Sequence, residues 1–122
     1  MTVQSVDWPV LNSLIFVNDA LNEDIPEIDE PSGLWLIPSC IAIGCLPDCD
    51  GSTKIILGPV HEAGTEKHLL FEGTVETPSR KLIVDTVLAE TLLETDVPET
   101  VTHLKIWTNG HPASDIVVIG IV

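Results

Sequence analysis

The sequence predicts an all-β protein: a two-sheet antiparallel β-sandwich or jelly roll with about seven to eight short strands. Short apolar runs rich in β-branched residues recur along the chain, and turn sequences containing Pro, Gly, Asn and Asp separate them. The 122 residues, 44% of them hydrophobic, are enough to bury one core. We therefore expect a single domain over residues 1–122.

The first half of the chain contains three apolar runs. Val10–Val17 is followed by a long polar stretch, and the next apolar run, Leu34–Ile43, is interrupted at Pro38. A Leu-Pro-Asp-Cys-Asp-Gly-Ser sequence, typical of a turn, then precedes Thr53–Leu57. Each of these three runs predicts a strand.

The second half shows the alternation of half-buried strands. In His68–Glu76, Phe71 and Val75 fall on one parity and the polar residues on the other. Residues 102–107 alternate in the same way, and Asn109-Gly110 predicts a turn before a buried strand, Ile116–Val122.

Residues 84–93 fit two structures. Val84, Val87, Leu88, Thr91 and Leu92 have the spacing of a helical face, so one short helix is an alternative there. Lys81–Val84 begins as a strand, and the Val and Thr content favours strands for the rest as well.

The charge is the strongest indication of function. Nineteen acidic residues against five basic ones give a net charge of −14 at pH 7. Such a surface repels phosphate, so we expect no nucleic-acid partner. It attracts a basic protein, although the same charge also keeps an apolar-rich chain soluble, and both interpretations stay open.

The sequence also bears on location. No uncharged apolar run reaches the about 20 residues of a membrane helix, and the first residues do not resemble a signal peptide. Three closely spaced cysteines, an odd number, agree with a reducing compartment. We therefore expect a cytoplasmic protein without a membrane partner, either a monomer or a homo-oligomer.

One polar stretch is the predicted partner contact, and we call residues Asp19–Glu30 the acidic segment. Its carboxylates have no basic residue among them, which is typical of an exposed loop that could enter a basic cleft or serve as a solvated connector. Glu90, Glu94, Asp96 and Glu99 form a second acidic cluster. Trp107 is a candidate apolar anchor, because it shares a strand parity with polar His103 and Lys105. The predicted contact residues are Asp19, Glu23, Asp24, Glu27, Asp29, Glu30 and Trp107.

Cys40, Cys45 and Cys49, with His61 and His68, are the residues most suited to a metal. Their spacing differs from that of common zinc motifs, and free cysteines in apolar runs are usually buried hydrophobic residues. The sequence contains no G-x-S-x-G, H-E-x-x-H or glycine-rich phosphate loop. We therefore predict no catalytic residues, no cofactor and no metal ligands.

The order of elements resembles the competence protein J family, small acidic β proteins that include an inhibitor of a DNA-entry nuclease. The resemblance covers Leu14–Asp19 (LIFVND), the acidic loop, the passage from Gly33 to Gly44 into a turn and strand, and the strands that end near the C-terminus. It implies a non-catalytic protein that occupies the active site or DNA-binding surface of a nuclease.

Three hypotheses follow. The first is a non-catalytic acidic binding module, an inhibitor or immunity-type protein whose carboxylates stand in for phosphates on a basic partner such as a nuclease. The second is a structural or assembly β-sandwich whose charge serves solubility. The third is an enzyme or metal-binding protein that uses the Cys/His cluster.

Overall fold

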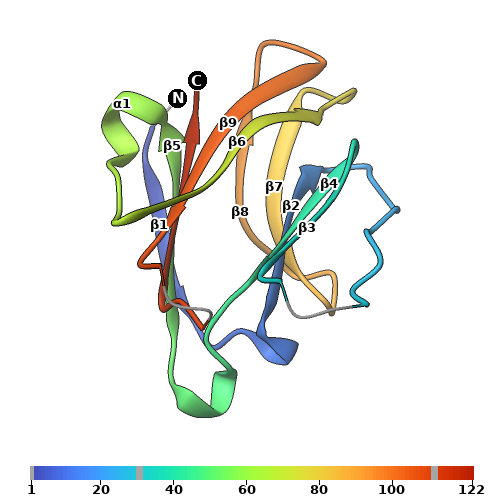
Figure 1. Ribbon diagram of the computed structural model, residues 1–122. Coiled ribbons are helices and arrows are strands. Elements are labelled where there is room, and N and C mark those ends of the chain that lie inside the picture. Colours follow the sequence, from blue (N-terminus) through green and yellow to red (C-terminus); the bar gives the residue numbers. More distant parts are fainter. Residues whose placement is uncertain (1, 30–31, 111–112) are drawn as a thin grey trace.

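The computed structural model describes residues 2–29, 32–110 and 113–122. In this part of the chain, ten strands form two five-stranded sheets that pack face to face (Figure 1). Sheet A contains, in spatial order, β1 (Gln4–Trp8), β5 (Thr53–Pro59), β10 (Ile116–Ile121), β9 (Val101–Thr108) and β6 (His68–Glu76). Sheet B contains β3 (Leu34–Ile37), β4 (Cys40–Gly44), β2 (Leu14–Asp19), β7 (Lys81–Thr86) and β8 (Thr91–Asp96).

The predicted β-sandwich is confirmed, with two corrections. The described residues form ten strands instead of seven to eight, because β1 was not expected and the run Leu34–Ile43 is a hairpin that turns at Pro38-Ser39. The strand predicted from Val10 begins only at Leu14, after a 3₁₀ turn at Leu11–Ser13. The pairing is antiparallel except between β5 and β10, which run parallel.

The segment that fits both a helix and a strand forms strands. β7 and β8 are an antiparallel hairpin, and its turn contains Ala89 at φ 60°. The described residues contain one short α-helical turn, α1 (Val60–Ala63), between β5 and β6. None of the helices among these residues is long and apolar enough to cross a membrane.

The inner faces of the two sheets form one core. The alternation predicted for β9 is confirmed, since Leu104 and Ile106 are buried and Lys105 between them is more exposed. The pairs Val17–Val84 and Ile119–Ile106 lie at matching positions on neighbouring strands and face inward. Burying side chains of this size stabilises the fold by about 1.5–3 kcal/mol each.

Candidate protein-binding surface

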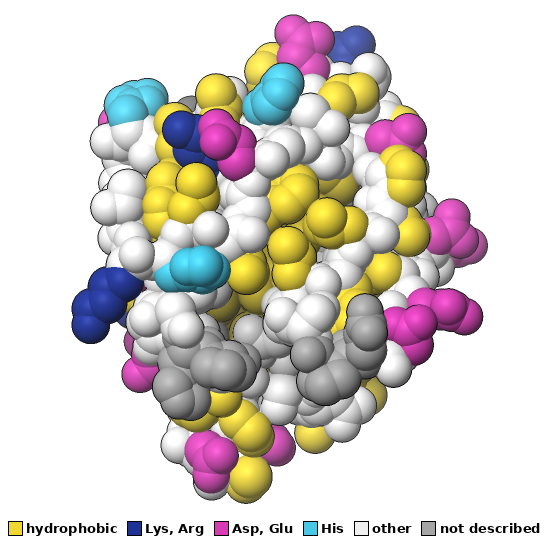
Figure 2. Space-filling view, in the orientation of Figure 1, with side chains coloured by type: hydrophobic (Ala, Val, Ile, Leu, Met, Phe, Trp, Pro, Cys, Tyr) yellow, Lys and Arg dark blue, Asp and Glu magenta, His cyan; other side chains and the backbone are white. Residues whose placement is uncertain are grey.

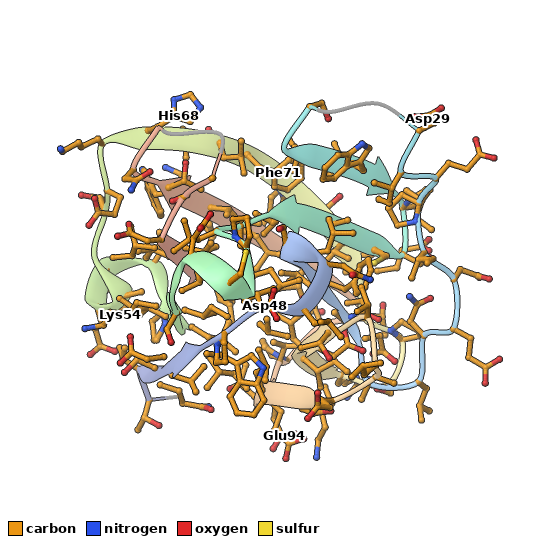
Figure 3. All side chains as sticks on the ribbon, turned by 90° about the horizontal axis from the view of Figure 1, so that it is seen from below. Asp29, Asp48, Lys54, His68, Phe71 and Glu94 are labelled. Atoms are coloured by element: carbon orange, nitrogen blue, oxygen red, sulfur yellow. The ribbon has the colours of Figure 1, made fainter. Side chains whose placement is uncertain are left out.

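The acidic segment lies along the outside of sheet B. It leaves the end of β2 and returns to the start of β3 at the sheet edge (Figure 1). Figure 3 shows Asp29 at the outer margin of the molecule, on the opposite side from Lys54 of sheet A. The segment is therefore an outer layer over one face of the sandwich.

Asp19 anchors the start of this segment. Its side chain is only 1% exposed. The Oδ1 atom accepts hydrogen bonds from the Ser79 backbone N–H at 3.0 Å and the Ser79 hydroxyl at 2.7 Å, and Oδ2 accepts one from the Leu21 N–H at 3.0 Å. These bonds tie the segment to the turn between β6 and β7. The Asp19 carboxylate thus differs from the others, because its oxygens are already used inside the fold.

The remaining described carboxylates of the segment face solvent. Glu23, Asp24, Glu27 and Asp29 are all exposed, whereas Pro26 between them is buried. Glu30 lies outside the described residues. Four carboxylates of the segment therefore stay available to a partner, whereas the buried residues among its described part are Asp19 and Pro26. The prediction that these residues contact a partner stays a prediction.

The segment covers an apolar surface on the outer side of sheet B. Phe16, Cys40 and Ala42 are buried there, with Trp35 and Ile37 packed against them. Ile25, Pro26, Glu27 and Asp29 of the segment line a groove along β3 on this side, so the segment lies over part of this surface. Sheet B thus buries apolar residues on both faces.

The second acidic cluster shares this side in part. Glu94 and Asp96 on β8 pair with Ile83 and Lys81, which have the same outward parity as Asp85 on β7. Both Glu94 and Asp96 are exposed. The fold therefore adds carboxylates of β8 to the side of the molecule that carries the acidic segment.

Trp107 lies on the opposite side of the molecule. It is half-buried on the outer face of sheet A, between Leu69 on β6 and Val118 on β10. Leu69 is 44% exposed, so the two side chains form a small apolar patch. One flat partner surface does not reach both this patch and the acidic segment.

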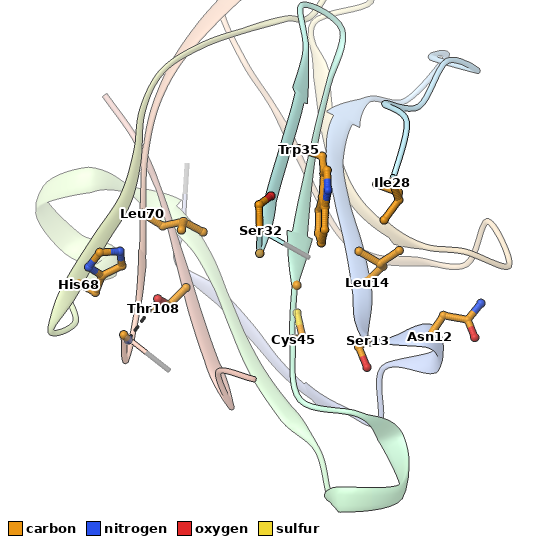
Figure 4. A pocket seen from close by; sticks show the side chains of 13 residues that line it. Asn12, Ser13, Leu14, Ile28, Ser32, Trp35, Cys45, His68, Leu70 and Thr108 are labelled. Atoms are coloured by element: carbon orange, nitrogen blue, oxygen red, sulfur yellow. Dashed lines mark hydrogen bonds between the residues drawn. The ribbon is translucent and has the colours of Figure 1, made fainter. Parts of the chain in front are cut away.

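An apolar cavity opens between the two sheets where β3 begins and β4 ends (Figure 4). It has a volume of about 470 Å³. Leu70 of β6 lines it from sheet A, and Leu14 and Trp35 line it from sheet B. Ile28, 40% exposed, brings the acidic segment to the same cavity. An apolar hollow thus lies beside the exposed carboxylates.

The charge around this hollow is uneven. Figure 2 shows hydrophobic side chains at the floor of a hollow between the sheets and carboxylates alone along the edge on the sheet B side, whereas the Lys and Arg side chains toward sheet A and the top have carboxylates near them. The sequence did not reveal the cavity, because its walls come from strands far apart in the chain.

The cysteines do not form a cluster. Cys40 is buried on the outer face of sheet B, Cys45 is buried between the sheets, and Cys49 is exposed. Burial raises the pKa of the Cys40 and Cys45 thiols to about 12, with the Asp85 charge adding to the effect at Cys40. The described residues contain no group of three or more His, Cys, Asp or Glu side chains placed to hold a metal ion.

No family model matches the chain, and no curated protein matches its sequence. Among solved structures, its fold matches that of ComJ from Bacillus subtilis, an inhibitor of the DNA degrading activity of NucA. The TM-score is 0.66, and the match covers 100% of this chain and 95% of that chain at 14% sequence identity. An identity this low speaks for the fold alone. The structure thus confirms the layout resemblance noted in the sequence: this chain has the fold of ComJ.

Proposed function

We propose that this chain is a protein inhibitor that binds a basic enzyme, such as a nuclease, through the acidic segment. The observation that carries the proposal is a row of exposed carboxylates held against a fold shared with a nuclease inhibitor. The only ion pair between side chains in the described part of the chain, Lys105–Glu72, lies on the outer face of sheet A. The carboxylates of the segment are therefore not neutralised by ion pairs within that part.

In this proposal, charge increases the rate of association and apolar contact supplies the affinity. The carboxylates steer a basic partner and speed its association, an effect that salt screens. Glu27 and Asp29 flank Ile28 in sequence, and Ile28 lines the apolar cavity, so the cavity lies next to these two carboxylates along the segment. Burial of an apolar side chain in that cavity would supply most of the affinity, as in other interfaces with a few dominant contacts.

The test is capture from a lysate of the source cell, followed by an inhibition assay. The segment variant replaces four exposed carboxylates with amides and leaves Asp19 intact: Glu23→Gln, Asp24→Asn, Glu27→Gln and Asp29→Asn. A control variant makes the same change in charge at exposed positions outside the segment: Asp7→Asn, Asp48→Asn, Asp50→Asn and Glu62→Gln.

We expect wild type and the control to capture a basic nuclease at low salt, to release it at high salt, and to inhibit its cleavage of DNA at a one-to-one ratio. The segment variant should capture much less. Equal capture by the segment variant, or no inhibited enzyme, would overturn the proposal and leave the segment as a solvated connector.

The apolar patch of sheet A favours a second candidate, assembly through an uncharged surface. Trp107 and Leu69 lie side by side there and are partly exposed. Association through this patch would persist at high salt, and Trp107→Ala would abolish it. Sedimentation of wild type and this variant across a salt series separates the two candidates.

A further inference from the structure

A second groove lies between the acidic segment and sheet B, separate from the cavity beside Ile28. It has a volume of about 380 Å³. Apolar walls come from Phe16 on β2, Val87 after β7 and Ile25 in the segment. The polar lining consists of Asn18, Asn22, Glu23, Asp85 and Thr86. The groove thus combines an apolar passage with a carboxylate from the sheet itself.

A chain of side-chain hydrogen bonds fixes this carboxylate. The Asn22 side-chain amide donates to Asn18 Oδ1 at 3.1 Å, and the Asn18 amide donates to Asp85 Oδ1 at 2.9 Å. Asn18 is 3% exposed, so its orientation is set by these two bonds. The bond from Asn18 engages one oxygen of Asp85, and Asp85 Oδ2 is not part of this chain of bonds.

The carboxylate lacks a cation within the described chain. Asp85 is half-buried, and burial raises its pKa above the usual range, while the bond from Asn18 opposes the rise. None of the residues that line the groove is Lys or Arg. A cation brought close by a partner would favour the charged form of this half-buried carboxylate.

We propose that this groove receives one arginine side chain of the basic partner, an inference that rests on the proposed function. The guanidinium group meets the carboxylates of Asp85 and Glu23, and the aliphatic part of the side chain lies between Phe16 and Ile25. Arginine suits the groove because its planar group bonds carboxylates while its stem packs on apolar surface. Arginine is also one of the residues enriched among the few strong contacts of protein interfaces.

The test uses the intact protein and a small probe, so that no partner is needed. ¹H–¹⁵N spectra are recorded while Nα-acetyl-arginine amide is added, and Nα-acetyl-citrulline amide serves as the uncharged analogue of the same shape. The Asp85→Asn variant removes the charge but keeps an oxygen that can accept the Asn18 bond. The Asp7→Asn variant removes one exposed charge on β1 of sheet A as the matched control.

We expect saturable shifts of the Asn18 and Asn22 side-chain amides with the arginine probe in wild type and in Asp7→Asn. The Asp85→Asn variant should bind the probe at least about tenfold more weakly, since a charged hydrogen bond is lost, and citrulline should give no saturable shift. Equal binding by Asp85→Asn, equal shifts with citrulline, or no saturable shift would overturn the proposal. Equal affinity for Nα-acetyl-lysine amide would overturn the choice of arginine.

Failure of this proposal is distinguishable from failure of the proposed function. If Asp85→Asn inhibits the captured enzyme as strongly as wild type, the groove is not an arginine site although the protein is an inhibitor. If the probe binds as expected but no enzyme is inhibited, the groove stands and the inhibitor function fails.

Discussion

The two sheets bury similar apolar faces against each other, but their outer faces differ in how far they are exposed to solvent. Sheet A leaves Lys54 and the patch around Trp107 open to solvent, with α1 packed over the end of β10. Sheet B carries apolar residues on its outer face and covers them with the acidic segment. On sheet B, much of the negative charge thus belongs to the acidic segment, and the contacts that anchor this segment determine where its carboxylates lie.

The largest expected effect on stability is at Asp19, which anchors the acidic segment. Asp19→Ala leaves the Ser79 and Leu21 N–H groups without their acceptor, so we expect it to lower the free energy of unfolding by about 3 kcal/mol. Asp29→Ala, an exposed carboxylate of the same segment, should change it by less than about 0.5 kcal/mol. Urea denaturation of the two variants measures both values.

Thiol labelling shows whether the loss is local to sheet B. In a Cys49→Ser background, Asp19→Ala should speed the modification of Cys40, on the outer face of sheet B where the acidic segment lies, more than that of Cys45 between the sheets. If both cysteines are modified faster by the same factor, the variant unfolds as a whole and Asp19 is not a specific anchor of the acidic segment.

Sheet A is tested at Gly120 on β10. An alanine Cβ there would lie 2.9 Å from Val60 Cγ2 and 3.0 Å from Val60 Cα, so Gly120→Ala should destabilise the protein by about 1–3 kcal/mol. Val60→Ala removes the Cγ2 contact, and the double variant should lose less stability than the sum of the two single variants. Strict additivity in thermal or urea denaturation would show that α1 moves away without cost.

Local patterns predicted the inner faces of the sandwich well, for a physical reason. Side-chain parity within a strand depends only on neighbouring residues, so the burial of Leu104 and Ile106 was readable from β9 alone. The parallel pairing of β5 with β10 depends on residues that lie more than half the chain apart, and no local pattern encodes it. The hairpin of β3 and β4 was missed because both strands are apolar on either side of Pro38.

The candidate site was harder to predict. Asp19 is indistinguishable in sequence from the other carboxylates of the acidic segment, because its role depends on Ser79, 60 residues further along the chain. Asp85 left a weak signal: it is an acidic residue within a strand, directly after the apolar residues 82–84, and charged residues are seldom buried without a partner. Trp107 is half-buried on the strand parity of His103 and Lys105 that made it a candidate anchor, but its distance from the segment depends on the fold.

A smaller effect on stability is expected at Asp85, in the groove between the acidic segment and sheet B. Its pKa is raised in the folded protein, so the folded state binds more protons than the unfolded state between pH 3.8 and the raised value. Stability contributed by this group is therefore lost as the pH rises through that window. Asp85→Asn removes this pH-dependent loss of stability. We therefore expect the difference in the midpoint of thermal unfolding, variant minus wild type, to be larger at pH 7 than at pH 4. A difference between the two proteins that is constant with pH would contradict the raised pKa.

The smallest expected effect is at the ion pair on the open face of sheet A. Lys105 Nζ lies 3.5 Å from Glu72 Oε2, and the two side chains are 36% and 58% exposed. Solvent screens such a pair, so a double-mutant cycle with Lys105→Ala and Glu72→Ala should give a coupling of about 0.5 kcal/mol or less that disappears in high salt. A larger, salt-resistant coupling would mean that sheet A, like sheet B, stabilises its outer face through a specific polar contact, and the contrast between the two faces would then be one of degree.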